Sequence, residues 1–356
     1  MRNKLRLALS VAVTASLIAL VTGCSTVGDV GKAPAAGASA SAGAAGTAKK
    51  FRIATVSKIE GITWFQRMSA GVVKFDGDNK GAVQAWQTGP DTADPAKQIA
   101  IVEDLIAQGV DAIIVVPNDP KSMAPTLKKA RDKGIIVGTT EAAALVGSDA
   151  IDFDIEAFDN VAFGEGFAKG LAKAMNGKGD YVGSVGSLTS ESHMTWFKSA
   201  VAYLKKNFPD MHLVKDQPYE NNNDDAKARA SALEIVNAYP KLAGFLGTTP
   251  AAGSGMASVL KEKKITTIAN VSLSLPSVAG PDLEAGWMSY AQTWDPAGWG
   301  YALNAVALAK LNKKEVATGA DLGYDGYNSV TVNGQLILGN ATMELSKGKP
   351  AAPYAF

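Results

Sequence analysis

From residue 51 onward, short apolar runs alternate with longer stretches in which apolar residues recur at helical spacing. Residues 51–57 have the pattern of a strand, and residues 64–80 have that of a helix. Residues 111–116 are almost entirely apolar, which is typical of a strand buried on both faces of a parallel sheet. Further strands are predicted at 82–86 and 134–138, and helices from Asp94 and over 120–133. This alternation predicts a doubly wound sheet with right-handed crossovers.

A second series of the same kind follows. Its predicted strands are 150–153, 181–185, 212–215, 242–246, 265–271 and 287–292, and its predicted helices are 160–175, 190–207, 223–238, 251–263 and 296–311. Short strands near 329–332 and 335–338 flank Asn333-Gly334, a dipeptide common in hairpin turns. The predicted fold class is therefore α/β, with two Rossmann-like doubly wound lobes.

The N-terminus has the pattern of an export signal. Three basic residues precede an apolar run at 7–21, and small residues lead to Cys24. Residues 20–24 resemble the bacterial lipobox, in which the cysteine becomes the first mature residue and carries diacylglycerol. We therefore predict a lipoprotein signal peptide over 1–23, lipidation of Cys24 and a flexible Ala/Gly/Ser tether over 24–50. The alternative is a short membrane span, although spans need ~17–25 residues.

Composition narrows the function classes. The chain has 356 residues, one Cys and two His, which excludes a disulfide framework and a Cys- or His-rich metal centre, and no cofactor is predicted. The formal charge of +1 becomes −2 once residues 1–23 are removed, because they hold three basic residues and no acid. A near-neutral body lacks the basic surface that nucleic acid requires. No phosphate loop, dinucleotide fingerprint or five-residue nucleophile elbow occurs.

Several motifs together identify a family. They are IATVSK at 53–58, Gly89-Pro90 and Asp94-Pro95 with Gln98, and LIAQGVDAIIV at 105–115. These segments resemble the opening lobe of the type I periplasmic sugar-binding proteins of ABC transporters, the ribose, rhamnose and autoinducer-2 group. The resemblance covers about residues 51–356.

That resemblance implies the type I periplasmic binding protein fold, with ligand enclosed between two lobes joined by a three-segment hinge. We expect 51–143 plus 294–325 to form the N-terminal lobe and 144–293 plus 326–356 the C-terminal lobe. The three crossings are expected near 140–147, 292–295 and 323–328.

The resemblance also places candidate ligand contacts in the N-terminal lobe. A sugar needs aromatic faces and fixed polar groups at the strand ends that line the cleft. Trp64 and Phe65 align with paired aromatics of the family, and Lys58 aligns with a ligand-contacting lysine of the autoinducer-2 receptors. Glu141 stands where the family usually has an aspartate that accepts hydroxyl hydrogens. The alternatives are core packing for the aromatics and a solvated surface position for Lys58.

Candidates in the second half of the chain depart more from the family. Ser192-His193 stands where the autoinducer-2 receptors have Asp-Gln, so an acceptor carboxylate is missing. Asn160 is expected to cap a helix rather than to touch ligand. The remaining predicted ligand contacts are Thr248, Pro250, Gln292, Trp294 and Asp295.

The predicted function is that of a lipid-anchored solute-binding protein of an ABC importer, held on the extracytoplasmic face of the membrane. It would capture a small sugar or sugar-like ligand as a monomer and deliver it to permease subunits. One alternative is a receptor for autoinducer-2 or another ligand that signals instead of feeding a transporter. The other is an α/β hydrolase-like enzyme, for which no motif is complete.

Overall fold

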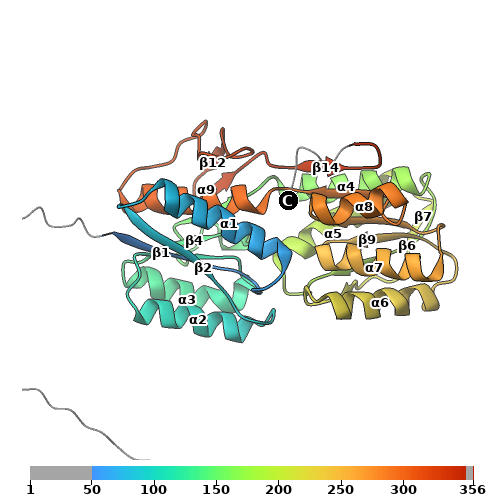
Figure 1. Ribbon diagram of the computed structural model, residues 1–356, viewed down its shortest axis with the longest axis horizontal. Coiled ribbons are helices and arrows are strands. Elements are labelled where there is room, and N and C mark those ends of the chain that lie inside the picture. Colours follow the sequence, from blue (N-terminus) through green and yellow to red (C-terminus); the bar gives the residue numbers. More distant parts are fainter. Residues whose placement is uncertain (1–49, 350–355) are drawn as a thin grey trace, which may run out of the picture. The chain divides into compact units, whose positions relative to one another are not determined.

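The structure is a computed structural model that describes residues 50–349 and 356. The predicted signal peptide, the lipidation site Cys24 and nearly all of the predicted tether lie outside the described residues. Residues from Ala48 to Phe356 cluster as one unit by their contacts, and Figure 1 labels its elements. None of the described helices is both long and apolar enough to cross a membrane.

The first lobe is built on a seven-stranded sheet in the order β12-β13-β5-β4-β3-β1-β2. Apart from the β12–β13 hairpin, all of its pairs are parallel. Figure 1 shows helices α1 and α9 on one face of this sheet and α2 and α3 on the other. The strands are β1 (Phe51–Val56), β2 (Val83–Thr88), β3 (Ala112–Val115), β4 (Ile136–Thr139), β5 (Phe153–Glu156), β12 (Thr331–Asn333) and β13 (Leu336–Leu338). The helices are α1 (Thr63–Asp78), α2 (Pro95–Ala107), α3 (Pro120–Asp132), α9 (Pro296–Leu311) and the short 3₁₀ helix η1 (Ala143–Leu145).

The second lobe is built on a sheet in the order β14-β11-β10-β9-β6-β7, with β8 paired to β6. Its pairs are parallel except that β14 runs antiparallel to β11. Helix α4 packs on α5, and α6 packs on α7. The strands are β6 (Gly179–Val185), β7 (Met211–Leu213), β8 (Tyr219–Glu220), β9 (Leu242–Gly247), β10 (Ala269–Leu273), β11 (Tyr290–Thr293) and β14 (Met343–Leu345). The helices are α4 (Asn160–Ala174), α5 (Glu191–Asn207), α6 (Asp225–Ala238), α7 (Pro250–Lys263) and α8 (Pro276–Ala285).

The chain passes between the two sheets three times. The crossings are residues 157–159 after β5, 294–295 after β11 and 339–342 after β13. The predicted α/β class with two doubly wound lobes is confirmed. The expected first and third crossings, near 140–147 and 323–328, need correction, because β5, β12 and β13 extend the first sheet beyond β4. Residues 144–156 and 326–338 therefore belong to the N-terminal lobe rather than to the C-terminal one.

Local sequence explains where several helices begin. Asp94, Asp119 and Asp295 each precede a proline, and each carboxylate accepts backbone N–H bonds from the first turn of its helix. Proline suits the first helical position because its fixed φ is helical and it has no N–H to leave unpaired. This pairing fixes the starts of α2, α3 and α9. Since α9 follows the second crossing directly, its cap also fixes the direction in which the chain re-enters the first lobe.

Candidate functional site

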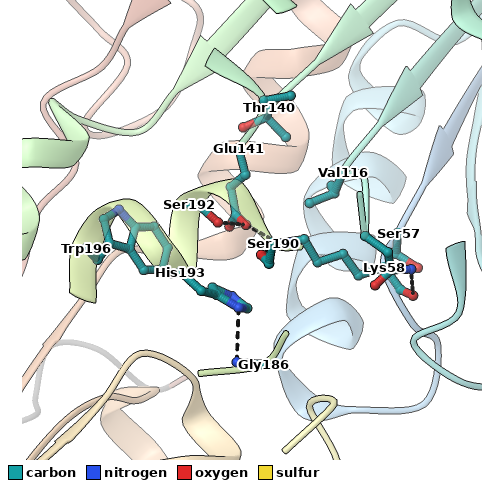
Figure 2. A network of polar contacts seen from close by, with 12 residues as sticks. Ser57, Lys58, Val116, Thr140, Glu141, Gly186, Ser190, Ser192, His193 and Trp196 are labelled. Carbon is teal, nitrogen blue, oxygen red and sulfur yellow. Dashed lines mark hydrogen bonds and ion pairs between the residues drawn. The ribbon is translucent and has the colours of Figure 1, made fainter. Parts of the chain in front are cut away.

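Polar side chains from both lobes meet where the strands end. Lys58 lies shortly after β1 and Glu141 shortly after β4, both in the first lobe. Ser190, Ser192 and His193 stand at the start of α5, which follows β6 of the second lobe. The carboxyl ends of parallel strands share one edge of a sheet, which is where α/β proteins place their ligands. Figure 2 shows these side chains converging between the lobes.

Lys58 and Glu141 form a buried ion pair within the first lobe. The two residues are 3% and 6% exposed, so each charge depends on the other for its stability in the interior. The same groups also contact the second lobe. Lys58 Nζ donates to Ser190 Oγ at 3.1 Å, and Ser192 Oγ donates to Glu141 Oε2 at 2.6 Å. The ion pair is thus bonded across the gap between the lobes through two hydroxyls (Figure 2).

The backbone at Glu141 is strained. Its φ is +54°, in the left-handed region that residues other than glycine rarely occupy. Such a conformation costs about 1–3 kcal/mol and persists where the surroundings hold it in place. Here it accompanies a carboxylate that reaches Lys58 and Ser192. Its contacts with Lys58 and Ser192 hold this conformation in place.

His193 lies on the second-lobe side of this cluster. It is 5% exposed, and its Nδ1 accepts a hydrogen bond from the backbone N–H of Gly186 at 3.3 Å. Burial, with a smaller contribution from the charge of Lys58, lowers the pKa of His193 well below its ordinary value. The imidazole is therefore neutral at physiological pH.

A cavity of about 20 Å³ lies at the centre of the cluster, which is room for about one water molecule. It adjoins a cavity of about 200 Å³ that shares Ile62, Trp64, Asn223 and Pro250 with it. On the other side, a cavity of about 230 Å³ shares Glu141. The residues around the central cavity are Lys58, Ile62, Trp64, Phe65, Glu141, His193, Asn223, Pro250, Leu273 and Trp294.

Seven of the ten predicted ligand contacts line this central cavity. They come from both lobes and from the second crossing: Lys58, Trp64, Phe65, Glu141, His193, Pro250 and Trp294. Their role in binding a ligand stays a prediction.

The aromatic members of the cavity also belong to the core. Trp64 and Trp294 meet edge to face with ring centroids 4.6 Å apart. Trp294 lies at the second crossing and further packs against Phe158 of the first crossing and Trp196 of the second lobe. Its indole N–H is buried without a hydrogen-bond partner among the described residues. Core packing and lining of the cavity are therefore combined in the same side chains.

The other three predicted contacts lie away from the central cavity, and each has a structural partner. Thr248 is fully buried, and its backbone N–H donates to the carbonyl of Ser184 at 3.0 Å. Gln292 donates from Nε2 to the carbonyl of Phe163 at 2.9 Å. Asp295 caps α9 and receives two hydrogen bonds from Arg67, at 2.8 and 2.7 Å, which raise the pKa of that guanidinium.

Sequence reasoning missed Asn223, which lines the central cavity and has a φ of +55°. The signal was the run of three asparagines at 221–223, because asparagine is the non-glycine residue that best tolerates left-handed backbone. Asn160 does not cap α4 as expected. Asp159 is the cap, because its carboxylate accepts from the N–H of Ala162, whereas Asn160 Oδ1 accepts from Trp196 Nε1 at 2.6 Å.

Metal chemistry has no support in the described part of the chain. Within residues 50–349 and 356, no three His, Cys, Asp or Glu side chains gather in a way that would hold a metal ion. The chemistry that this arrangement offers is hydrogen bonding and apolar contact. It comprises a paired carboxylate and ammonium, two hydroxyls, a neutral imidazole and indole faces.

Comparison with known proteins defines the class. A family model described as a periplasmic binding protein domain matches residues 53–315. The chain belongs to this periplasmic binding protein family. The predicted resemblance and the prediction of a binding protein rather than an enzyme are thereby confirmed.

Curated relatives bind sugars or sugar alcohols. The D-ribose/D-allose-binding protein of Pseudomonas aeruginosa is 28% identical over 60% of this chain and 67% of its own length. The xylitol-binding protein of Mycolicibacterium smegmatis is 28% identical over 51% of this chain and 50% of its own length. The galactofuranose-binding protein YtfQ of Escherichia coli is 30% identical over 34% of this chain and 38% of its own length. This chain thus spans half or less of the length of the last two.

Solved structures share the fold at low sequence identity. LsrB from Clostridium saccharobutylicum in complex with AI-2 has a TM-score of 0.78 and 16% identity, and the match covers 86% of this chain and all of that one. An ABC transporter solute-binding protein from Clostridium phytofermentas with bound L-rhamnose has a TM-score of 0.77 and 18% identity, with 86% and 98% of the two chains covered. These likenesses establish the two-lobed fold.

Proposed function

We propose that this protein is the extracytoplasmic solute receptor of an ABC importer and that it binds a small neutral sugar or sugar alcohol between its lobes. The observation that carries the proposal is the buried cluster at the strand ends, in which Lys58 and Glu141 of one lobe face His193 of the other. Trp64 and Trp294 add aromatic faces to it. This combination matches what a sugar requires, which is polar groups for its hydroxyls and flat apolar surfaces for its C–H faces.

Each group has a role in this proposal. The Glu141 carboxylate accepts ligand hydroxyl hydrogens, and Lys58 and His193 donate to ligand oxygens. The central cavity of about 20 Å³ is smaller than any sugar. Entry therefore requires the lobes to separate by rotation at the three crossings. The ligand then favours the closed state through its contacts with both lobes.

The relatives support the ligand class. Their names specify ribose or allose, xylitol and galactofuranose. A thermal-shift screen of the mature protein should therefore include D-ribose, D-allose, xylitol, L-rhamnose and AI-2, with amino acids and nucleosides as the contrasting set. Ligand at 100 times Kd should stabilise the protein by ~2.7 kcal/mol. A response confined to the contrasting set would refute the sugar assignment.

Membrane attachment is part of the proposal and rests on the lipobox-like sequence before Cys24. Lipid on Cys24 would hold the receptor beside its transporter, with each buried CH₂ contributing ~0.8 kcal/mol. Replacing Cys24 by Ser should release the protein from the membrane fraction. Because the chain has a single Cys, incorporation of labelled fatty acid should vanish in the same variant. A variant that stays in the membrane fraction would indicate an uncleaved span instead.

Transport is distinguished from signalling by uptake. Deleting the protein should abolish uptake of the radiolabelled sugar identified in the screen, and expressing it again should restore uptake. Unchanged uptake in the deletion strain would count against an importer and favour a receptor that signals.

A further inference from the structure

One contact in the cluster constrains the chemistry of His193. Gly186, the residue after β6, donates its backbone N–H to Nδ1 of the imidazole. A ring nitrogen that accepts a hydrogen bond carries no proton of its own. A neutral imidazole that accepts at Nδ1 must therefore carry its single proton on Nε2.

The close approach depends on the absence of a side chain at residue 186. A Cβ there would lie 2.7 Å from both Nδ1 and Cε1 of His193 and 3.0 Å from Oδ1 of Asn223. The ring also packs against Trp196, with centroids 5.6 Å apart. Gly186 is thus the residue that lets the backbone reach the ring.

The other ring nitrogen, Nε2, is not the one that Gly186 contacts. His193 lines the central cavity, and among the described residues its Nε2 has no hydrogen-bond partner. Burial and the neighbouring charge of Lys58 both oppose protonation of the ring. Nδ1 therefore accepts from Gly186, and the Nε2–H group remains available to donate to a ligand.

We infer that His193 is a specificity-determining residue, locked by Gly186 as an Nε2–H donor that selects an oxygen acceptor on the ligand. The inference rests on the proposed function and deepens it. Glu141 in the first lobe is an acceptor, whereas His193 in the second lobe is a donor. A ligand that fits presents hydroxyl hydrogens to Glu141 and a hydroxyl, ring or carbonyl oxygen to His193. Neutral sugars and sugar alcohols carry both kinds of group.

The lock is testable without a ligand. Nitrogen-15 NMR distinguishes the two neutral tautomers of histidine, and the chain has only two His, so a His212→Gln variant assigns the signals. At pH 7 we expect His193 to be the Nε2–H tautomer. Gly186→Ala should alter that signature, whereas Gly77→Ala should not, because a Cβ at Gly77 in α1 would meet no atom within 4 Å. A His193 that carries its proton on Nδ1, or that is charged, overturns the inference.

Binding tests the donor role. His193→Leu should weaken binding of the best of D-ribose, xylitol and L-rhamnose by about ten- to a hundredfold, since a buried ligand oxygen loses its partner. His193→Gln, which keeps an N–H donor, should retain most of the affinity. Equal affinity in wild type and His193→Leu overturns the inference and the donor role of His193, while the assignment as a sugar receptor stays intact. If wild type binds none of these sugars, the proposed function fails, and the tautomer measurement alone then decides whether the lock exists.

Discussion

The two lobes contribute chemically different groups to the same cluster. The first lobe supplies both charges, Lys58 and Glu141, whereas the second supplies neutral groups, namely Ser190, Ser192 and His193. The charges are therefore paired within one lobe, and separation of the lobes need not separate them. In the proposed opening, water replaces the bond from Lys58 to Ser190, the bond from Ser192 to Glu141, and two further bonds between the lobes, Ala144–Glu191 and Thr189–Asn118. This division allows a buried ion pair and a reversible closure to coexist.

The largest expected effect on stability comes from breaking the buried ion pair of the first lobe. Lys58→Met leaves Glu141 buried without its partner, which should lower the free energy of unfolding by about 3–5 kcal/mol. Combining it with Glu141→Gln should restore much of the loss, because no unpaired charge remains. Urea denaturation of the two variants measures this difference.

Lys74→Met is the matched control. Lys74 lies on α1 in the first lobe and pairs with Asp78 at the surface, with 54% of its side chain exposed. Solvent screens such a pair, so we expect no measurable change in stability. Similar losses for Lys58→Met and Lys74→Met would mean that burial of the Lys58–Glu141 pair has no special importance.

The second expected effect is a pH dependence of stability that arises from the buried carboxylates on β5 of the first lobe. Burial raises the pKa of Asp154 to about 6, and burial together with Asp154 raises the pKa of Glu156. Because the folded pKa of Asp154 exceeds its unfolded value of about 3.9, the native state binds more protons between these values. Asp154 therefore contributes less to stability as the pH rises from about 4 to about 6. Asp154→Asn should reduce this loss of stability by up to about 3 kcal/mol in total between pH 4 and pH 6.

Denaturation at a series of pH values measures that loss. His193 acts in the opposite sense, because its lowered pKa makes the fold less stable as the pH falls through the unfolded value of about 6.5. The quantity to compare is thus the difference in the free energy of unfolding between wild type and Asp154→Asn at each pH. The exposed residue Asp216 offers a control, and Asp216→Asn should leave the profile unchanged. A constant difference from pH 4 to 7 would contradict the assignment to Asp154.

The smallest expected effect comes from removing neutral groups of the second lobe, and it concerns the equilibrium between closed and separated lobes. Ser190→Ala with Ser192→Ala removes the two hydroxyl contacts of the second lobe with the Lys58–Glu141 pair, and it removes no helix cap, because the Ser190 side chain makes no capping bond. Loss of about 1 kcal/mol should shift the unliganded equilibrium toward separated lobes by roughly fivefold. Small-angle scattering should register a larger radius of gyration. Ser199→Ala, whose hydroxyl bonds only carbonyls of its own helix, should leave it unchanged.

Much of the fold was predictable from local sequence. The almost entirely apolar run at 111–116 and the Asp-Pro pairs that begin α2 and α9 depend on neighbours along the chain, and they were placed well. The lobe boundaries were not, because β5 and β13 are short strands whose sheet is decided by pairing between residues far apart in sequence. Helix α8 was not among the predicted elements for a different reason. It contains Pro276 and Pro281, and proline is more typical of loops than of helix interiors.

The candidate site was predictable only in part, for a related reason. Lys58, Trp64 and Glu141 follow recognisable strands, so their positions at the sheet edge could be inferred. Gln292 and Asp295 sit at comparable strand ends but bond to Phe163 and Arg67 instead. Whether a polar side chain at a strand end turns toward the cavity or toward a helix depends on tertiary packing, which one sequence does not encode in a local pattern.

The aromatic packing at the crossings also provides an intrinsic fluorescence probe of the arrangement of the lobes. Trp294 occupies the second crossing and touches Trp64 of one lobe and Trp196 of the other. If the lobes rotate on binding as proposed, the surroundings of that indole change, and with them its emission. Capture of a solute can then be followed from intrinsic fluorescence, in real time and without a label, on an unmodified receptor.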